Sequence, residues 1–249
     1  MGEDNGVLKR DLLTIIEPGL NIDSLELDHA KSGSGTFFAY NCGVSRMILV
    51  RHGRTAWHAE GRYAGTADIG LDEVGRKQVE LIAGRLEDAG IEQVYSSPLS
   101  RCLELAERVA GSHGLEVTVD ERLREIDLGR WDGETYTDII ERDGEILKKW
   151  TADPTSVTVP GGESLAAVQE RAMEWFSQAV AEHPEGTVLA SSHGGPIRSI
   201  LAAVIDLPLS KIFRLQVDLA SISIVNYKGK FSNLELLNET CHLEVSRSV

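Results

Sequence analysis

The stretch MILVRHGRTAW, residues 47–57, decides how the chain folds and where its chemistry lies. Four apolar residues stop abruptly at Arg51, His52 and Gly53, which predicts a short buried strand that runs into a loop. The guanidinium of Arg51 offers a planar set of donors, and the imidazole of His52 can serve as base or nucleophile. We therefore expect this strand end to bind an anion if other segments of the chain supply matching groups.

Length and composition favour one catalytic domain with flanking segments. With 249 residues, 42% of them hydrophobic, the chain can build one sizeable core. We expect this domain at residues 47–240, an N-terminal extension at 1–46, and a C-terminal tail at 241–249 that frays after Cys241. The patterns expected in the extension are a short helix at 7–16 and a hairpin at 25–27 and 36–40.

The acidic balance of the chain restricts its partners. The formal net charge of −14 disfavours nucleic acid and anionic membranes, because binding to either needs a basic face. No window approaches the apolar length that spans a bilayer, and the first residues, MGEDNGVLKRDLL, are acidic where a secretory signal is basic. We expect a cytoplasmic protein whose phosphate site, if present, is a local cluster of arginines.

The three cysteines, Cys42, Cys102 and Cys241, lie far apart and lack paired spacing with histidines. This pattern argues against both a disulfide framework and a structural zinc site. We expect reduced thiols with structural roles, and Cys102 on the buried face of a helix.

From residue 47 onward, strand-like and helix-like stretches alternate, which predicts a mainly parallel sheet with helices on both faces, a three-layer α/β/α sandwich. The expected strands are 47–50, 92–95, 116–119 and 187–190, followed by a closing hairpin at 222–227 and 231–237. The expected helices are one that begins behind Asp72 as its N-cap and stops at Gly90, 99–109, 137–150, a long helix after Ser164, and 196–207 with Pro196 at its first position.

Polar breaks follow three of these strands and carry Arg51 with His52, Arg101, and His193. Because ligands of open α/β sheets bind at the carboxyl ends of the strands, we expect these side chains to meet in one pocket. Two arginines can clamp a phosphoryl group, and an imidazole can attack phosphorus. Glu125 lies close to apolar residues in sequence, so partial desolvation would suit its carboxyl to hold a proton for the leaving group.

Six segments carry a resemblance to a known family. In chain order they are LVRHGRTAW (49–57), GLDEVGRKQ (70–78), YSSPLSR (95–101), REIDLGRWDG (124–133), PGGES (160–164) and SSHGGPIR (191–198). In these motifs the chain resembles the histidine phosphatase, or phosphoglycerate mutase-like, superfamily, from residue 47 to the end of the hairpin.

The resemblance implies a metal-independent phosphomonoesterase without a cofactor that acts on a small phosphorylated metabolite. It implies that His52 becomes phosphohistidine, that Arg51, Arg101 and His193 hold the phosphoryl group, and that Glu125 is proton donor and then base. The further candidates for substrate binding are Arg54, Thr55, His58 and Gly194. The identity of the phosphate ester and the oligomeric state stay open.

Departures from the family pattern favour the phosphatase branch. His58 stands where many members have an asparagine that touches phosphate, and Arg54 stands where relatives often have glutamate. The mutase branch has tyrosine and lysine where this chain has Leu128 and Tyr136, and asparagine where it has Gly195.

Two alternatives remain at this point: a phosphoglycerate mutase, and a phosphate-binding scaffold without activity. Glu125 has a rival role as ion-pair partner of Arg122 or Arg124. We interpret Trp150, like the other tryptophans, as a packing residue. Specificity is expected to come from the excursion at 137–162 and from the extension.

Overall fold

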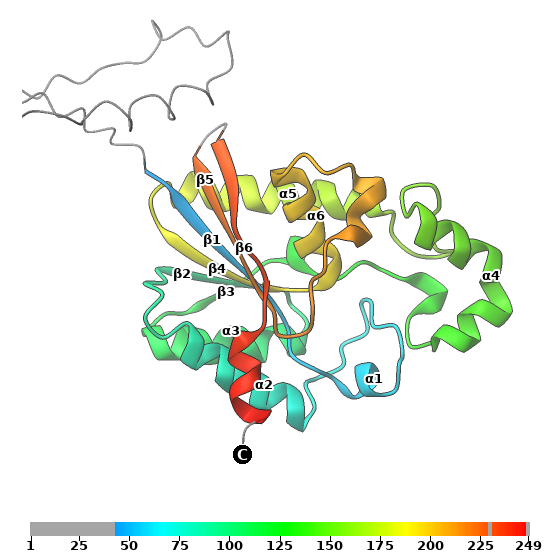
Figure 1. Cartoon of the computed structure of the whole chain (residues 1–249), viewed down its shortest axis with the longest axis horizontal. Coiled ribbons are helices and arrows are strands. Elements are labelled where there is room, and N and C mark those ends of the chain that lie inside the picture. The colour runs from blue at the N-terminus through cyan, green and yellow to red at the C-terminus, as the bar shows by residue number, and fades with distance from the viewer. Residues whose placement is uncertain (1–42, 229–230, 248–249) are drawn as a thin grey trace, which may run out of the picture. The chain divides into compact units, whose positions relative to one another are not determined.

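The computed structural model describes residues 43–228 and 231–247 (Figure 1). The helix and hairpin expected at 7–40 lie outside the described residues. Within the described ranges, no helix is long and apolar enough to cross a membrane.

A six-stranded sheet in the order β3-β2-β4-β1-β5-β6 forms the centre of the fold. The four strands from β3 to β1 pair in parallel, whereas β5 and β6 form the antiparallel closing hairpin. The mainly parallel sheet expected from the sequence is therefore confirmed. The strands are β1 (Ser45–Arg51), β2 (Gln93–Ser96), β3 (Val117–Val119), β4 (Thr187–Ser192), β5 (Ile222–Lys228) and β6 (Phe231–Glu239).

Helices cover both faces of this sheet, as Figure 1 shows with α5 and α6 on one side and α2 and α3 on the other. The α-helices are α1 (Ala56–Ala59), α2 (Glu73–Arg85), α3 (Ser100–His113), α4 (Tyr136–Ala152), α5 (Leu165–Glu182) and α6 (Gly194–Val204). The 3-10 helices are η2 (Glu121–Leu123), η3 (Gly129–Trp131), η4 (Leu209–Arg214) and η5 (Cys241–Arg247).

Two hydrophobic cores explain the three layers, because side chains of a strand point alternately to its two faces. Met47 and Leu49 of β1 pack in the core that α4, α5 and α6 cover. Ile48 and Val50 pack in the core that α2 and α3 cover. The α/β/α sandwich is therefore confirmed, and its sheet is buried on both faces.

The structure corrects two expected boundaries. Helix α6 begins at Gly194 instead of Pro196 and ends at Val204 instead of Leu207. Proline fits there because the first N–H groups of a helix have no partner within the helix. The segment after Cys241 is not frayed in the described part: η5 packs on α2, and buried His242 contacts the carbonyl oxygen of Ala220 at 3.1 Å.

Candidate active site

The ends of β1 and β4 bring two histidines together. Arg51 pairs in register with Ser192, and the backbone N–H of His52 donates to the carbonyl of Ser192 at 3.1 Å. The residues that follow the two strands, His52 and His193, therefore lie side by side, with ring centroids 5.0 Å apart. The convergence expected at the carboxyl edge of the sheet is observed.

The loop after β1 needs a glycine for this arrangement. A Cβ on Gly53 would lie 2.7 Å from the carbonyl oxygen of Gly75 in the first turn of α2. The glycine lets the loop pack directly on that helix, which Asp72 caps by accepting from the N–H of Gly75 at 2.7 Å.

His52 is a buried, neutral imidazole with a defined free nitrogen. Its Nδ1 lies 2.7 Å from the carbonyl oxygen of Gly53. Because a carbonyl only accepts, Nδ1 carries the hydrogen and Nε2 keeps its lone pair. Burial first, then the charges of Arg101 and Arg51, lower the pKa of His52 well below 6.5. At neutral pH, Nε2 is therefore unprotonated and nucleophilic.

His193 is also buried, and its pKa lies well below 6.5 because of burial and the charge of Arg101. Its Nε2 lies 2.7 Å from Oγ of Ser97 and 3.4 Å from Sγ of Cys102. Burial raises the pKa of Cys102 to about 12, so this sulfur is a thiol. Cys102 is fully buried on α3, as expected.

Arg51 and Arg101 are held by backbone carbonyls. Nη1 of Arg51 donates to Val217 at 2.7 Å, and the guanidinium of Arg101 donates to Gly65 and Ala67 at 2.7 and 2.8 Å. The Nε atoms of both arginines are buried and have no acceptor among the described residues. Burial lowers the pKa of Arg51 to about 10, which leaves it charged at neutral pH. Two cations with unused donors thus flank the histidines.

Glu125 faces the same region and is held by backbone N–H groups. Its Oε1 accepts from Ile126 at 2.9 Å and from Gly195 at 3.0 Å. A Cβ on Gly195 would lie 2.4 Å from this oxygen, so glycine makes room for the carboxyl. The rival ion pairs are wrong: Arg122 pairs with Asp120 and Glu174, and Arg124 with Glu163.

A cavity of about 290 Å³ opens above these groups. Its polar wall contains Arg51, His58, Glu125, Gly195 and Arg198, and its other lining residues are Gly61, Arg62, Tyr63, Ala64, Ile126, Leu128, Trp150, Leu165, Ile212 and Phe213. The catalytic candidates His52, Arg101 and His193 are at most 2% exposed and lie behind this lining. Among the described lining residues, Glu125 carries the only carboxyl group.

Comparison with known proteins agrees with this geometry. The profile of the histidine phosphatase superfamily (branch 1) matches residues 47–240. The chain belongs to this superfamily. It is 36% identical over 198 residues to phosphoserine phosphatase 1 of Hydrogenobacter thermophilus, an alignment that covers 80% of this chain and 94% of that protein.

Solved structures of phosphatases share the fold of this histidine phosphatase. A mycobacterial glucosyl-3-phosphoglycerate phosphatase in complex with VO3 has a TM-score of 0.74 at 30% identity, over 78% of this chain and 99% of that one. Bacillus stearothermophilus YhfR has a TM-score of 0.77 at 32% identity, over 80% and 100% of the two chains. The enzyme is a phosphatase of this superfamily.

The four candidates for substrate binding in this histidine phosphatase differ in whether they line the cavity. His58 lines the cavity, with Nδ1 2.7 Å from Oγ1 of Thr55, the buried N-cap of α1. Burial and the charge of Arg51 lower the pKa of His58 to about 4, so it is neutral. Arg54 is outside the lining, because its Nε is bound to Asp72 at 2.7 Å. Gly194 lets Arg198 approach: a Cβ there would lie 2.7 Å from Nη1 of Arg198.

Three residues near the histidines were missed as functional residues, although all lie in quoted motifs: Ser97, Gly195 and Arg198. Arg198 follows Gly194 by four positions on α6, and residues at this spacing share a helix face. That spacing was available as a signal. Gly195 was noted only as a departure from the mutase pattern, and its contact with Glu125, 70 residues away, carries no local signal; the same holds for Ser97, whose partner is 96 residues away.

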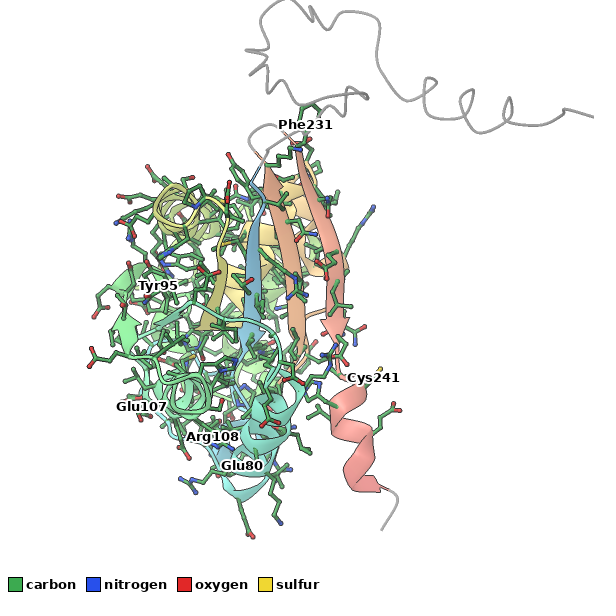
Figure 2. All side chains as sticks on the ribbon, turned by 90° about the vertical axis from the view of Figure 1, so that its left-hand side faces the viewer. Glu80, Tyr95, Glu107, Arg108, Phe231 and Cys241 are labelled. Atoms are coloured by element: carbon green, nitrogen blue, oxygen red, sulfur yellow. The ribbon has the colours of Figure 1, made fainter. Side chains whose placement is uncertain are left out.

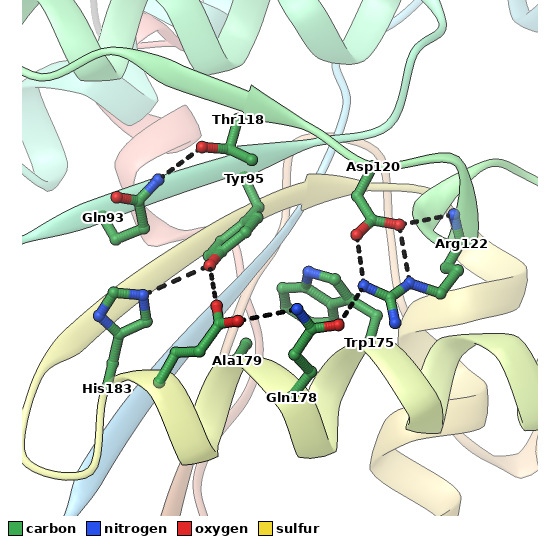
Figure 3. Close-up of a pocket in the computed structure, with 10 residues that line it drawn as sticks. Gln93, Tyr95, Thr118, Asp120, Arg122, Trp175, Gln178, Ala179 and His183 are labelled. Atoms are coloured by element: carbon green, nitrogen blue, oxygen red, sulfur yellow. Dashed lines mark hydrogen bonds and ion pairs between the residues drawn. The ribbon is translucent and has the colours of Figure 1, made fainter.

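A larger hollow, of about 450 Å³, lies beside the start of β2 and is lined from β2, β3 and α5 (Figure 3). Its polar groups pair with one another: the hydroxyl of Tyr95 with Glu182 at 3.1 Å, and Arg122 with Asp120. Burial raises the pKa of Tyr95 to about 12, so its hydroxyl stays protonated. Its one lining cation already has carboxylate partners, so we place the phosphoryl site at the smaller cavity instead.

Proposed function

We propose that this phosphatase hydrolyses a small phosphate monoester through a phosphohistidine on His52. The observation that carries this proposal is the pairing of His52, neutral with Nε2 free, with His193 at 5.0 Å beside two arginines with unused donors. An anionic phosphoryl oxygen would satisfy those buried N–H groups better than any neutral ligand.

In the first step, the lone pair of Nε2 of His52 forms the N–P bond while the P–O bond to the alcohol breaks. Protonated Glu125 gives its proton to the departing oxygen, so a neutral alcohol leaves. Arg51 and Arg101 stabilise the charge on the equatorial oxygens. In the second step, Glu125 takes a proton from water, the water oxygen attacks phosphorus, and the N–P bond breaks to release inorganic phosphate.

Two further residues support this mechanism by position. Ser97 fixes the ring of His193 through the 2.7 Å contact at Nε2. Arg198 lines the cavity and donates from Nε to the carbonyl of Leu215 at 2.8 Å. Its Nη1 makes none of the hydrogen bonds seen in the described part of the chain, which leaves this donor for a phosphoryl oxygen.

The proposal is tested by trapping the intermediate. Wild-type protein is mixed with ³²P-labelled p-nitrophenyl phosphate, quenched and assayed for protein-bound phosphate that is labile to acid and stable to base. We expect labelling in wild type and none in His52→Ala, with His113→Gln, at the end of α3, as a matched histidine control. Equal labelling of wild type and His52→Ala would overturn the assignment of the nucleophile.

A mutase remains the second candidate, because curated relatives include a probable phosphoglycerate mutase of Yersinia pestis at 30% identity. Against it, a Cβ on residue 195 would lie 2.4 Å from Oε1 of Glu125, so a larger residue there would displace the carboxyl. Incubation with 3-phosphoglycerate separates the two: release of inorganic phosphate supports the phosphatase, and formation of 2-phosphoglycerate without release supports the mutase.

A further inference from the structure

The apolar side of the active-site cavity is built from aromatic residues that support one another. The ring centroids of Trp150 and Phe213 lie 4.8 Å apart, and Trp150 in turn packs edge-on against the fully buried Trp131 at 5.8 Å. Phe213 is nevertheless 43% exposed. Because Phe213 lines the cavity, this exposed ring is available for contact with an apolar part of a ligand.

Secondary structure holds this wall at the mouth of the cavity. Trp150 stands in the last turn of α4, and Phe213 stands on the 3-10 helix η4 with Ile212 behind it. The backbone of α4 departs from helical geometry at Asp143, whose buried side chain accepts from Nε1 of Trp131 at 2.9 Å, which fixes the helix against the core. The aromatic pair is therefore a preformed surface.

The positive charges around the phosphoryl site are taken up by Glu125, Asp218 and a bound phosphate group. Arg51, Arg101 and Arg198 carry three positive charges, and Glu125 and then Asp218 partly offset those of Arg51 and Arg198. A phosphate dianion takes up the positive charge that is left.

The remaining cation of the cavity wall, Arg62, is already bound to other groups of the protein. Arg62 is bound to Glu60 at 2.7 Å and donates to the carbonyl of Gly133 at 2.8 Å. Among the described lining residues, no unpaired cation faces the aromatic wall, so a substrate carboxylate would find no partner there.

We propose that Trp150 and Phe213 form a platform for an apolar or aromatic group of the alcohol portion, so that the enzyme prefers phosphate monoesters of such alcohols over those of charged amino or hydroxy acids. This inference rests on the proposed function for its location, because the platform lies beside the phosphoryl site. It names a substrate class that the fold alone does not define.

Binding of unreactive phosphonates tests the platform without requiring turnover. The dissociation constants of propylphosphonate, 3-phenylpropylphosphonate and 2-amino-4-phosphonobutanoate are measured by calorimetry with the full-length protein. We expect the phenyl compound to bind at least about tenfold more tightly than the propyl compound, because its ring leaves water for an apolar wall. The amino acid phosphonate should bind more weakly than the phenyl compound.

Matched variants locate the effect. Trp150→Ala and Phe213→Ala should each bring the phenyl and propyl constants within about threefold of each other. Phe231→Ala should leave the ratio unchanged, because this aromatic residue is 69% exposed and is not among the residues that line the cavity. It stands at the start of β6, where Figure 2 labels it. The ratio of the two dissociation constants does not depend on the fraction of folded protein. Because the side chain of Phe213 is partly exposed, its removal carries little risk to folding.

The possible failures are distinguishable. Equal binding of phenyl and propyl phosphonates in wild type, tighter binding of the amino acid phosphonate, or an unchanged ratio in both platform variants would each overturn the platform. Absence of acid-labile phosphate on His52, with the phosphonate ratio intact, would instead overturn the proposed mechanism and leave the platform standing.

Discussion

Replacement of Gly195 by alanine is expected to disable proton donation while leaving the fold intact. The Cβ of residue 195 would lie 2.4 Å from Oε1 of Glu125, where ordinary contact begins at 3.4 Å. Because the Cβ is fixed to the backbone of α6 and the carboxyl ends a flexible side chain, the carboxyl retreats by about 1 Å. A misplacement of about 1 Å at a reacting group costs roughly 100-fold in rate.

The assay compares two leaving groups. Because Glu125 also activates water in the second step, which both substrates share, the comparison uses kcat/KM, which reports the first step. For an alkyl phosphate, whose alkoxide needs a proton, we expect kcat/KM to fall about 100-fold in Gly195→Ala. For p-nitrophenyl phosphate, whose leaving group needs little protonation, we expect kcat/KM to fall by less than about fivefold. Circular dichroism and the thermal midpoint check that the fold is retained.

Gly84→Ala provides the matched control, because a Cβ on this glycine of α2 meets nothing within 4 Å. It should leave both rates unchanged and raise the thermal midpoint, since alanine favours a helix by about 1 kcal/mol over glycine. Equal losses for the two substrates in Gly195→Ala, or no loss for either, would refute the reasoning that glycine positions the acid.

Three further predictions concern the same site. Glu125→Gln should lower kcat/KM, which reports the first step, about 100-fold for an alkyl phosphate and much less for p-nitrophenyl phosphate; equal losses of kcat/KM would remove Glu125 from the acid role. Ser97→Ala should lower kcat about tenfold by freeing the ring of His193, with recovery in Ser97→Thr, whereas a loss confined to KM would contradict this positioning role. Lowering the pH from 7.5 to 5.5 should reduce the free energy of unfolding, because His52 and His193 have pKa values well below 6.5 in the folded protein. Above pH 6.5 these histidines are unprotonated in both the folded and the unfolded chain. Below pH 6.5 the unfolded chain binds protons that the buried imidazoles do not, so the free energy of unfolding falls by up to about 1.4 kcal/mol per pH unit for each histidine. Urea unfolding at both pH values measures this change, and equal stabilities would contradict buried neutral imidazoles.

The convergence of Arg51, His52, Arg101 and His193 was predictable because it depends on local patterns. Buried parallel strands are recognisable as short apolar runs, and their carboxyl ends meet at one edge of the sheet. The excursion at 137–162 was expected to influence specificity, and Trp150, one of its residues, does line the cavity. The same residue also packs against Trp131, as its interpretation as a packing residue predicts.

Contacts that depend on side-chain placement over long distances were not predictable. Arg54 was expected to bind substrate, but its Nε instead binds Asp72, 18 positions along the chain. Arg198 is positioned by carbonyls of the segment after η4, which carries no recognisable pattern. Such pairings are decided by which partner the folded chain brings within reach, and no periodicity in sequence encodes that choice.

The reaction needs arginines that are held in place and that keep their positive charge, and hydrogen bonds to backbone carbonyls supply both properties. Arg51, Arg101 and Arg198 donate to backbone carbonyls of Val217, Gly65, Ala67 and Leu215, not to carboxylates. Carbonyls fix the guanidinium groups without forming ion pairs with them, and in a buried site charge is weakly screened. Together with burial, the charges of Arg101 and Arg51 lower the pKa of His52, which keeps Nε2 available for attack, and the same charges attract the phosphate dianion. In a chain with a net charge of −14, this is how a local positive site persists.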